Sequence, residues 1–129
     1  MAARAQKMLS VLRQVSEELA EFEPGVLVKL GYRMDGGGET DREHLWFEVH
    51  GFQGDSVDAT LTNAPFYIAR LQQGARGLHP LELLSDWAVF TPFGRVDPRQ
   101  TRTLRFIRAN RERLREVMVS VKAKAANPG

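Results

Sequence analysis

The spacing of apolar residues changes at Pro24-Gly25, and this change constrains the fold more than any other feature of the chain. Before it, apolar side chains recur at alternating four- and three-residue steps, which predicts one face of a helix over about residues 3–22. The residues of this face are Met8, Leu12, Val15, Leu19 and Phe22. From Val26 to Met34 the period becomes two, which is typical of a strand. The chain therefore begins with a helix and continues into a sheet.

Further segments of period two predict a small antiparallel sheet. Strands over residues 44–50 and 57–62 are separated by a short turn and form a hairpin. A glycine-rich connector over residues 35–41 precedes them. Residues 66–71 are predicted to resume pairing briefly, and residues 78–89 add one or two short strands or a helical turn.

The C-terminal part predicts a long helix over residues 97–124. Asp97 is placed to cap it, Pro98 suits the first helical position, and Gln100 completes a capping-box spacing. The buried stripe consists of Leu104, Ile107, Leu114, Met118 and Val121. The predicted class is therefore α+β, in one domain over residues 1–129. It has an N-terminal helix, a curved, barrel-like antiparallel sheet of four to six strands, and a C-terminal helix packed on it.

The composition excludes several kinds of site. The chain has no cysteine, which removes disulfides, thiolate metal sites and a cysteine nucleophile, and suits a reducing cytosol. Charged residues interrupt the N-terminal apolar pattern, so no signal peptide is expected. No apolar run is long enough to cross a bilayer. We therefore expect a cytoplasmic protein that does not bind membranes.

Three short motifs follow one another in the middle of the chain. They are the aromatic segment at residues 43–49, Leu-x-Asn-x-Pro at residues 61–65, and Ser-Asp-Trp at residues 85–87, with Gly74 between the last two. In this order and spacing they resemble a bacterial family known as domain of unknown function 2314. The resemblance covers about residues 43–95 and implies a small bacterial protein or appended domain. It implies no activity, cofactor or site residue.

Basic residues are concentrated in the last quarter of the chain. Residues 1–96 hold nine basic and thirteen acidic side chains, a net charge of −4. Residues 97–129 hold nine basic and three acidic ones, a net charge of +6. The candidates for binding a partner in this segment are Arg99, Arg102, Arg105 and Arg108. Their partner is an acidic protein or, without sequence preference, the phosphates of a nucleic acid.

An intramolecular role for the same arginines is an equal alternative. Four acidic residues crowd the C-terminal end of the first helix, where the helix dipole disfavours anions. They are Glu17, Glu18, Glu21 and Glu23. If the two terminal helices pack together, these charges pair with the arginines and no ligand is needed.

The outer face of the predicted hairpin carries a second set of candidate partner-binding residues, namely Trp46, Glu48, His50 and Asp58. A metal site is not expected among them. His44 and His50 share this face, but six strand residues separate them by roughly 20 Å, too far for one ion. Polar residues on a sheet face are usually solvated. We therefore predict no metal and no cofactor.

A ligand pocket is a further alternative, with Trp46 facing Asp86 and Trp87. The simpler interpretation is that Trp87 anchors the core and Asp86 caps a turn. No serine lies in a nucleophile elbow. The glycine run at residues 36–38 lacks the lysine and the helix of a phosphate-binding loop. No catalytic residue is therefore assigned, and we do not expect an enzyme.

These observations favour a non-enzymatic protein-interaction module of a bacterial cytosol, such as an immunity-type or regulatory binder. It would bind its partner through the outer sheet face or the arginine-rich helix. Nucleic-acid binding by that helix is the first alternative. A small-molecule-binding or metal-dependent enzyme is the second. The apolar face of the first helix also allows a second copy of the chain as the partner.

Overall fold

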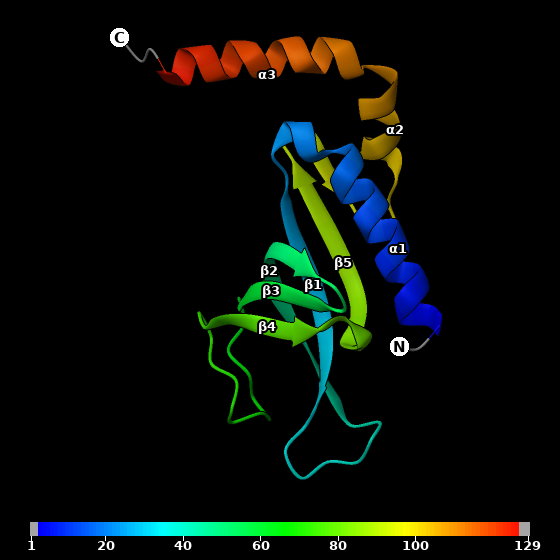
Figure 1. Ribbon diagram of the computed structural model, residues 1–129, viewed down its shortest axis with the longest axis vertical. Coiled ribbons are helices and arrows are strands. Elements are labelled where there is room, and N and C mark those ends of the chain that lie inside the picture. The colour runs from blue at the N-terminus through cyan, green and yellow to red at the C-terminus, as the bar shows by residue number, and fades with distance from the viewer. Residues whose placement is uncertain (1–2, 127–129) are drawn as a thin grey trace.

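The computed structural model describes residues 3–126 as an open antiparallel sheet with a helix before it and helices after it. The elements follow in this order: α1 (Ala3–Glu18), the 3₁₀ turn η1 (Ala20–Phe22), β1 (Gly25–Arg33), β2 (Arg42–Gln53), β3 (Ser56–Leu61), β4 (Arg76–Pro80), the 3₁₀ turn η2 (Leu81–Leu83), β5 (Leu84–Thr91), β6 (Gly94–Val96), α2 (Arg102–Ala109) and α3 (Arg111–Ala126). Figure 1 shows their arrangement. The predicted α+β class is confirmed.

The six strands lie in the order β4-β3-β2-β1-β5-β6, and each neighbouring pair is antiparallel. The predicted hairpin is formed by β2 and β3. Within residues 3–126 the edge strands β4 and β6 do not pair with each other. The sheet is therefore open, and the expected barrel-like closure does not occur. To close the sheet, β4 would have to pair with β6, but β6 has only three residues.

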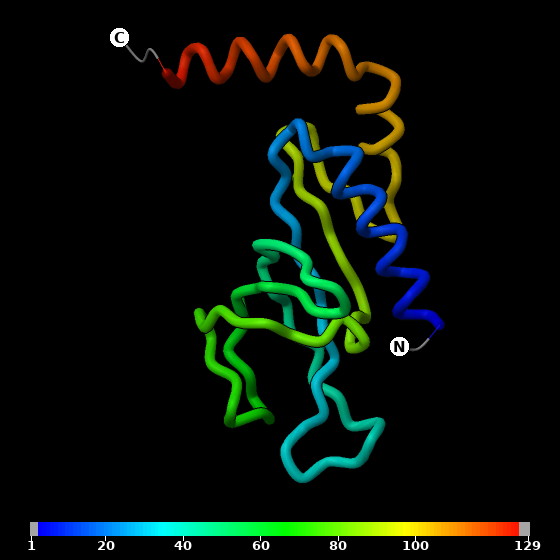
Figure 2. The backbone as a smooth tube through the Cα atoms, viewed as in Figure 1, coloured from blue at the N-terminus to red at the C-terminus, as the bar shows by residue number. Residues whose placement is uncertain are grey.

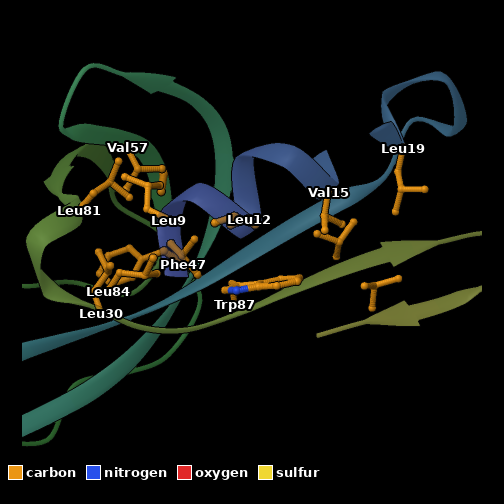
Figure 3. Close-up of a cluster of buried hydrophobic side chains, with 14 of the residues drawn as sticks. Leu9, Leu12, Val15, Leu19, Leu30, Phe47, Val57, Leu81, Leu84 and Trp87 are labelled. Carbon is orange, nitrogen blue, oxygen red and sulfur yellow. The ribbon is translucent and has the colours of Figure 1, made fainter. Parts of the chain in front are cut away.

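The hydrophobic core lies between α1 and one face of the sheet (Figure 3). Leu9, Leu12 and Val15 point from α1 toward Phe47 and Trp87, and all five are at most 6% exposed. Fully burying a side chain of this size contributes about 1.5–3 kcal/mol. The apolar stripe of α1 is therefore a core contact.

The start of the C-terminal helical region differs from the prediction. The Asp97 carboxylate accepts hydrogen bonds from the backbone N–H groups of Arg99 and Gln100, at 2.8 and 3.0 Å. It closes a turn before the helix and does not cap the helix itself. Helix α2 begins only at Arg102, because residues 97–100 close back on themselves through a backbone bridge.

The predicted single C-terminal helix is two helices that meet at Asn110. The Asn110 side chain donates a hydrogen bond to the Phe106 carbonyl at 2.9 Å, and this bond belongs to the last turn of α2. Helix α3 continues in a new direction across the end of the molecule (Figure 1). Asparagine disfavours a helix interior because its side chain competes for nearby backbone groups.

Residues 62–75 form a loop between β3 and β4, and the strand pairing predicted over residues 66–71 is absent. This loop lies at the same end of the molecule as the β1–β2 connection (Figure 2). Ile68 anchors it in the core, with only 3% of its surface exposed. The loop ends in a turn in which the Ala75 N–H donates to the Gln72 carbonyl at 3.1 Å, and Gly74 has a φ of +86°, which glycine adopts without strain.

Candidate functional site

Two carboxylates hold the loop between β3 and β4. Glu43, in β2, accepts hydrogen bonds from the backbone N–H groups of Phe66 and Tyr67, at 2.9 and 3.0 Å. Asp35 accepts one from the backbone N–H of Ala69 at 2.8 Å. The backbone N–H of Asp35 donates to the Tyr67 carbonyl at 2.9 Å. Bonds to ionised carboxylates are stronger than neutral ones, so they favour one conformation of the loop.

The Leu-x-Asn-x-Pro motif shapes the first part of the same loop. The side-chain oxygen of Asn63 accepts a hydrogen bond from the backbone N–H of Trp46 at 2.7 Å. The backbone N–H of Thr62 donates to the Trp46 carbonyl at 2.9 Å. Pro65 has no N–H group and cannot extend the ladder. The motif therefore ends β3 and starts the loop.

The loop presents two aromatic side chains to solvent, Phe66 and Tyr67, which we call the aromatic pair. Phe66 is 85% exposed and Tyr67 is 59% exposed, and their ring centroids are 6.4 Å apart. Large aromatic side chains usually bury most of their surface. The bonds to Glu43 and Asp35 fix the backbone and keep the aromatic pair in this outward position.

Behind the loop, the buried Tyr32 and the partly buried His79 form a hydrogen-bonded pair. The Tyr32 hydroxyl lies 2.5 Å from Nδ1 of His79. The Arg70 guanidinium lies 5.2 Å from the centre of the Tyr32 ring. Burial lowers the pKa of His79, and the charge of Arg70 lowers it further, whereas burial raises the pKa of Tyr32. Both shifts favour the uncharged forms, so one hydrogen bond joins a neutral hydroxyl and a neutral imidazole at neutral pH.

We expect the free energy of unfolding to fall as the pH drops through the histidine range. Because the pKa of His79 is lower in the folded chain, the unfolded chain binds more protons below about pH 6.5. The stability from neutral His79 is complete above that pH and is lost on acidification toward the lower folded pKa. Urea unfolding at about pH 7.5 and about pH 5.5 measures this loss.

The variant His79→Phe is the matched control for this pH dependence. It is expected to lose less stability than the wild type over the same interval. Glu18 and Glu21 do not confuse the comparison, because arginine neighbours lower the pKa of each carboxyl below 4.5, so both titrate at more acidic pH. An identical loss in His79→Phe would contradict the assignment.

The residues predicted on the outer face lie on β2 and β3, and His50 and Asp58 bind different neighbours. Nε2 of His50 lies 2.7 Å from Oγ1 of Thr60. Asp58 accepts two hydrogen bonds from Arg76, at 2.8 and 3.0 Å, and these bonds lower its pKa. Glu48 is exposed. Over residues 3–126, no three His, Cys, Asp or Glu side chains are placed to hold a metal ion.

The residues Trp46, Asp86 and Trp87 do not line a common pocket. Lys29 pairs in register with both Trp46 and Asp86, so these three lie on the sheet face opposite the core. Trp87 follows Asp86 and points into the core. The Asp86 carboxylate accepts hydrogen bonds from the backbone N–H of Trp87 at 2.9 Å and from Arg99 at 2.8 Å. The predicted bond to a nearby backbone amide is therefore present, but within β5 and not at a turn. The pocket hypothesis is corrected, because neighbouring strand residues face opposite sides, and Trp87 is confirmed as a core residue.

The arginines of the C-terminal segment divide into paired and unpaired groups. Arg108 donates to both carboxylate oxygens of Glu18 at 2.7 Å, and Arg99 is bound to Asp86. Further ion pairs join α3 to the end of α1, to η1 and to the residue after η1, namely Arg111 with Glu18 and Glu21, Arg115 with Glu21, and Lys122 with Glu23. Pairing between the two terminal helical regions is therefore observed.

Arg102 and Arg105 differ from these paired arginines. Their side chains make no hydrogen bond or ion pair with any residue that the structure describes. The four arginines predicted as one binding group thus split into two that are held within the chain and two that are available.

We call the loop over residues 62–75, which carries the aromatic pair, the aromatic loop. The predicted site includes neither the aromatic pair, Phe66 and Tyr67, nor the two carboxylates that hold the loop, Asp35 and Glu43. A signal for them exists in the sequence, because Glu43 opens the first motif and Phe66-Tyr67 directly follow the second. Their connection depends on hydrogen bonds between segments more than twenty residues apart, which no local pattern reports.

The fold and the loop define a class of small α+β proteins with an open six-stranded antiparallel sheet and an N-terminal helix over one face. Residues 2–111 match the family described as "Uncharacterized protein conserved in bacteria (DUF2314)", and the chain belongs to this family. The match includes the whole aromatic loop and ends where α3 begins. Among curated proteins and solved structures nothing matches significantly. None of the described helices is long and apolar enough to cross a membrane.

Proposed function

We propose that this chain is a non-enzymatic protein-binding module of the bacterial cytosol, with the aromatic pair at the centre of its binding surface. The observation that carries the proposal is the 85% exposure of Phe66 on a loop that Glu43 and Asp35 hold in place. Aromatic anchors supply much of the energy of protein interfaces. A loop that is ordered before binding loses little entropy on binding. An immunity-type or regulatory binder fits this description.

A pull-down from a lysate of the native host tests the proposal. The wild type and the double variant Phe66→Ala/Tyr67→Ala serve as baits, with nuclease treatment and mass spectrometry. We expect one protein retained by the wild type and lost by the variant. For the purified pair, the dissociation constant should rise by about a hundredfold, which corresponds to about 2.8 kcal/mol.

The variant Phe90→Ala is the matched control, because Phe90 is 41% exposed on β5, away from the loop. It should bind the partner as the wild type does. Both members of the aromatic pair are exposed, so the double variant should change the free energy of unfolding by only about 0.5 kcal/mol. Equal partner binding by the double variant and the wild type would refute the proposal.

Nucleic-acid binding by α2 is a second candidate function, and Phe106 favours it. Phe106 is 49% exposed and lies one turn from Arg102, with Arg105 beside it. The two arginines have no partner among the described residues. Arginine and an exposed aromatic ring together bind single strands through phosphate contacts and base stacking.

Fluorescence anisotropy with a labelled single-stranded oligonucleotide tests this candidate. Affinity should fall steeply with salt, and Arg102→Ala/Arg105→Ala should flatten that dependence by about two units of logarithmic slope at most. Arg113→Ala, on α3, is the control and should have a smaller effect. Absent or salt-insensitive binding would exclude nucleic acid as the ligand.

A further inference from the structure

Strand β4 is an open edge of the sheet. It pairs with β3 over five residues, from Arg76 opposite Thr60 to Pro80 opposite Ser56. It is the first strand in the sheet order, so no strand from the described part of the chain lies on its other side (Figure 1). The other edge strand, β6, is shorter and leads into the turn before α2. An unpaired edge offers backbone donors and acceptors to another extended chain.

The hydrogen bonds at the two ends of β4 identify which of its residues face outward. They are Leu61 N–H to the Ala75 carbonyl and Leu81 N–H to the Asp55 carbonyl. Hydrogen-bonded pairs recur at every second residue of an antiparallel ladder, so Gly77 and His79 bond to β3. The N–H and C=O groups of Arg76 and Leu78 therefore point away from the sheet, and no described residue bonds to them.

A small hollow lies between this edge and the loop that carries the aromatic pair. It has a volume of about 150 Å³, with Leu61 and Leu71 as apolar lining and Arg70 and His79 also contributing. Gly77 opens onto the hollow, since a Cβ atom added there would meet no atom within 4 Å. The side chain of Arg70 contacts the Tyr32 ring and has no carboxylate partner among the described residues.

We propose that β4 binds an extended segment of the protein partner as an additional strand. One aliphatic side chain of this segment enters the hollow at Gly77, and an acidic side chain pairs with Arg70. The outward backbone groups of Arg76 and Leu78 supply the hydrogen bonds, as in other cases of strand addition. Leu78, now 57% exposed, becomes covered on the opposite face. This inference rests on the proposed protein-binding function and names the form of the partner.

A second copy of the chain fits this edge poorly. In an antiparallel pair, facing residues lie on the same side of the sheet. The residues of a second β4 on the side of the hollow would be Gly77 and His79, and neither supplies an aliphatic side chain. Pro80 also lacks an N–H group for the shared ladder. The hollow and Arg70 therefore favour a segment of a different protein.

Selection from a displayed library of random peptides, with the complete chain as bait, tests the inference. We expect binders that carry an aliphatic residue and an acidic residue in an alternating, strand-like pattern. A selected peptide should slow amide hydrogen exchange at Arg76 and Leu78. The amides of Gly77 and His79 should change little, because they already bond to β3. Failure to select any peptide, or protection at other amides only, would overturn the inference.

The variant Gly77→Val fills the hollow without touching the aromatic pair. It should weaken the selected peptide by about tenfold or more. Gly51→Val is the matched control, because a Cβ at Gly51 also meets no atom within 4 Å but lies on β2. Equal peptide binding by Gly77→Val and the wild type would refute strand addition at this edge. Sedimentation that shows a dimer broken by Gly77→Val would assign the edge to a second copy instead.

These results are separable from a failure of the proposed function. The pull-down with the aromatic-pair variant tests whether the loop binds a protein at all. The peptide selection and the Gly77→Val variant test only whether the edge strand β4 binds a partner segment as an added strand. A partner that is lost from the aromatic-pair variant but kept by Gly77→Val would retain the function and reject the added strand.

Discussion

Replacing Trp87 with alanine is expected to lower the free energy of unfolding by about 3–5 kcal/mol. Trp87 heads the set of largest fully buried side chains and lies between α1 and the sheet (Figure 3). Its removal leaves a cavity at the centre of the core, and Leu12 and Phe47 cannot collapse to fill it without straining the sheet. Urea denaturation followed by circular dichroism measures the change.

Trp46→Ala is the matched control, because the chain has two tryptophans and they face opposite sides of the sheet. Trp46 is partly exposed, and its ring lies 5.1 Å from Nζ of Lys29. Loss of this cation–π contact and of partial burial should cost about 1 kcal/mol. A larger loss for Trp46→Ala than for Trp87→Ala would show that the two faces are assigned the wrong way round.

Glu43→Ala is expected to release the aromatic loop and to lower the free energy of unfolding by about 2 kcal/mol. The substitution removes the acceptor of two backbone hydrogen bonds at once, from Phe66 and Tyr67. Both bonds end on an ionised carboxylate, which makes each stronger than a neutral bond. Amide hydrogen exchange at Phe66 and Tyr67 should accelerate, and partner binding through the aromatic pair should weaken.

Two further variants separate the loop contact from a general effect of charge. Glu39→Ala removes an exposed acidic residue that pairs with Arg42, and such pairs contribute about 0–1 kcal/mol. Glu43→Gln keeps one acceptor oxygen and should fall between Glu43→Ala and the wild type. Unchanged exchange at Phe66 in Glu43→Ala would mean that other contacts hold the loop.

Elements with a clear local pattern could be predicted from the sequence. The stripe through Leu12 and Val15 identified α1, and alternation through Leu45 and Phe47 identified β2, because each pattern lies within one element. The family motifs were also recognised locally. The acidic end of α1 and the basic C-terminal segment suggested their mutual ion pairs, since the dipole of α1 disfavours anions at its C-terminal end.

Features that depend on contacts between distant segments could not be predicted. Apolar spacing continues from Ile107 to Leu114 across Asn110, so periodicity alone gives one helix where the chain has two. Whether the sheet closes depends on β4 meeting β6, which no local pattern encodes. The role of Glu43 depends on a loop that lies 23 residues later in the chain. In each case the deciding interaction joins residues that are far apart in sequence.

Beyond the bend at Asn110, the position of helix α3 depends on the ionic strength of the solution. Helix α3 is about 24 Å long, from its sixteen residues, and Leu114 is its one buried side chain among those described. Its remaining attachment runs largely through ion pairs at the surface, to Glu18, Glu21 and Glu23. Dissolved ions weaken such pairs over a distance of about 10 Å at 0.1 M salt, but they leave the apolar core unaffected. We therefore expect the position of α3, and with it the overall shape of the protein, to change with ionic strength. The sheet and α1, which enclose the core, should not change.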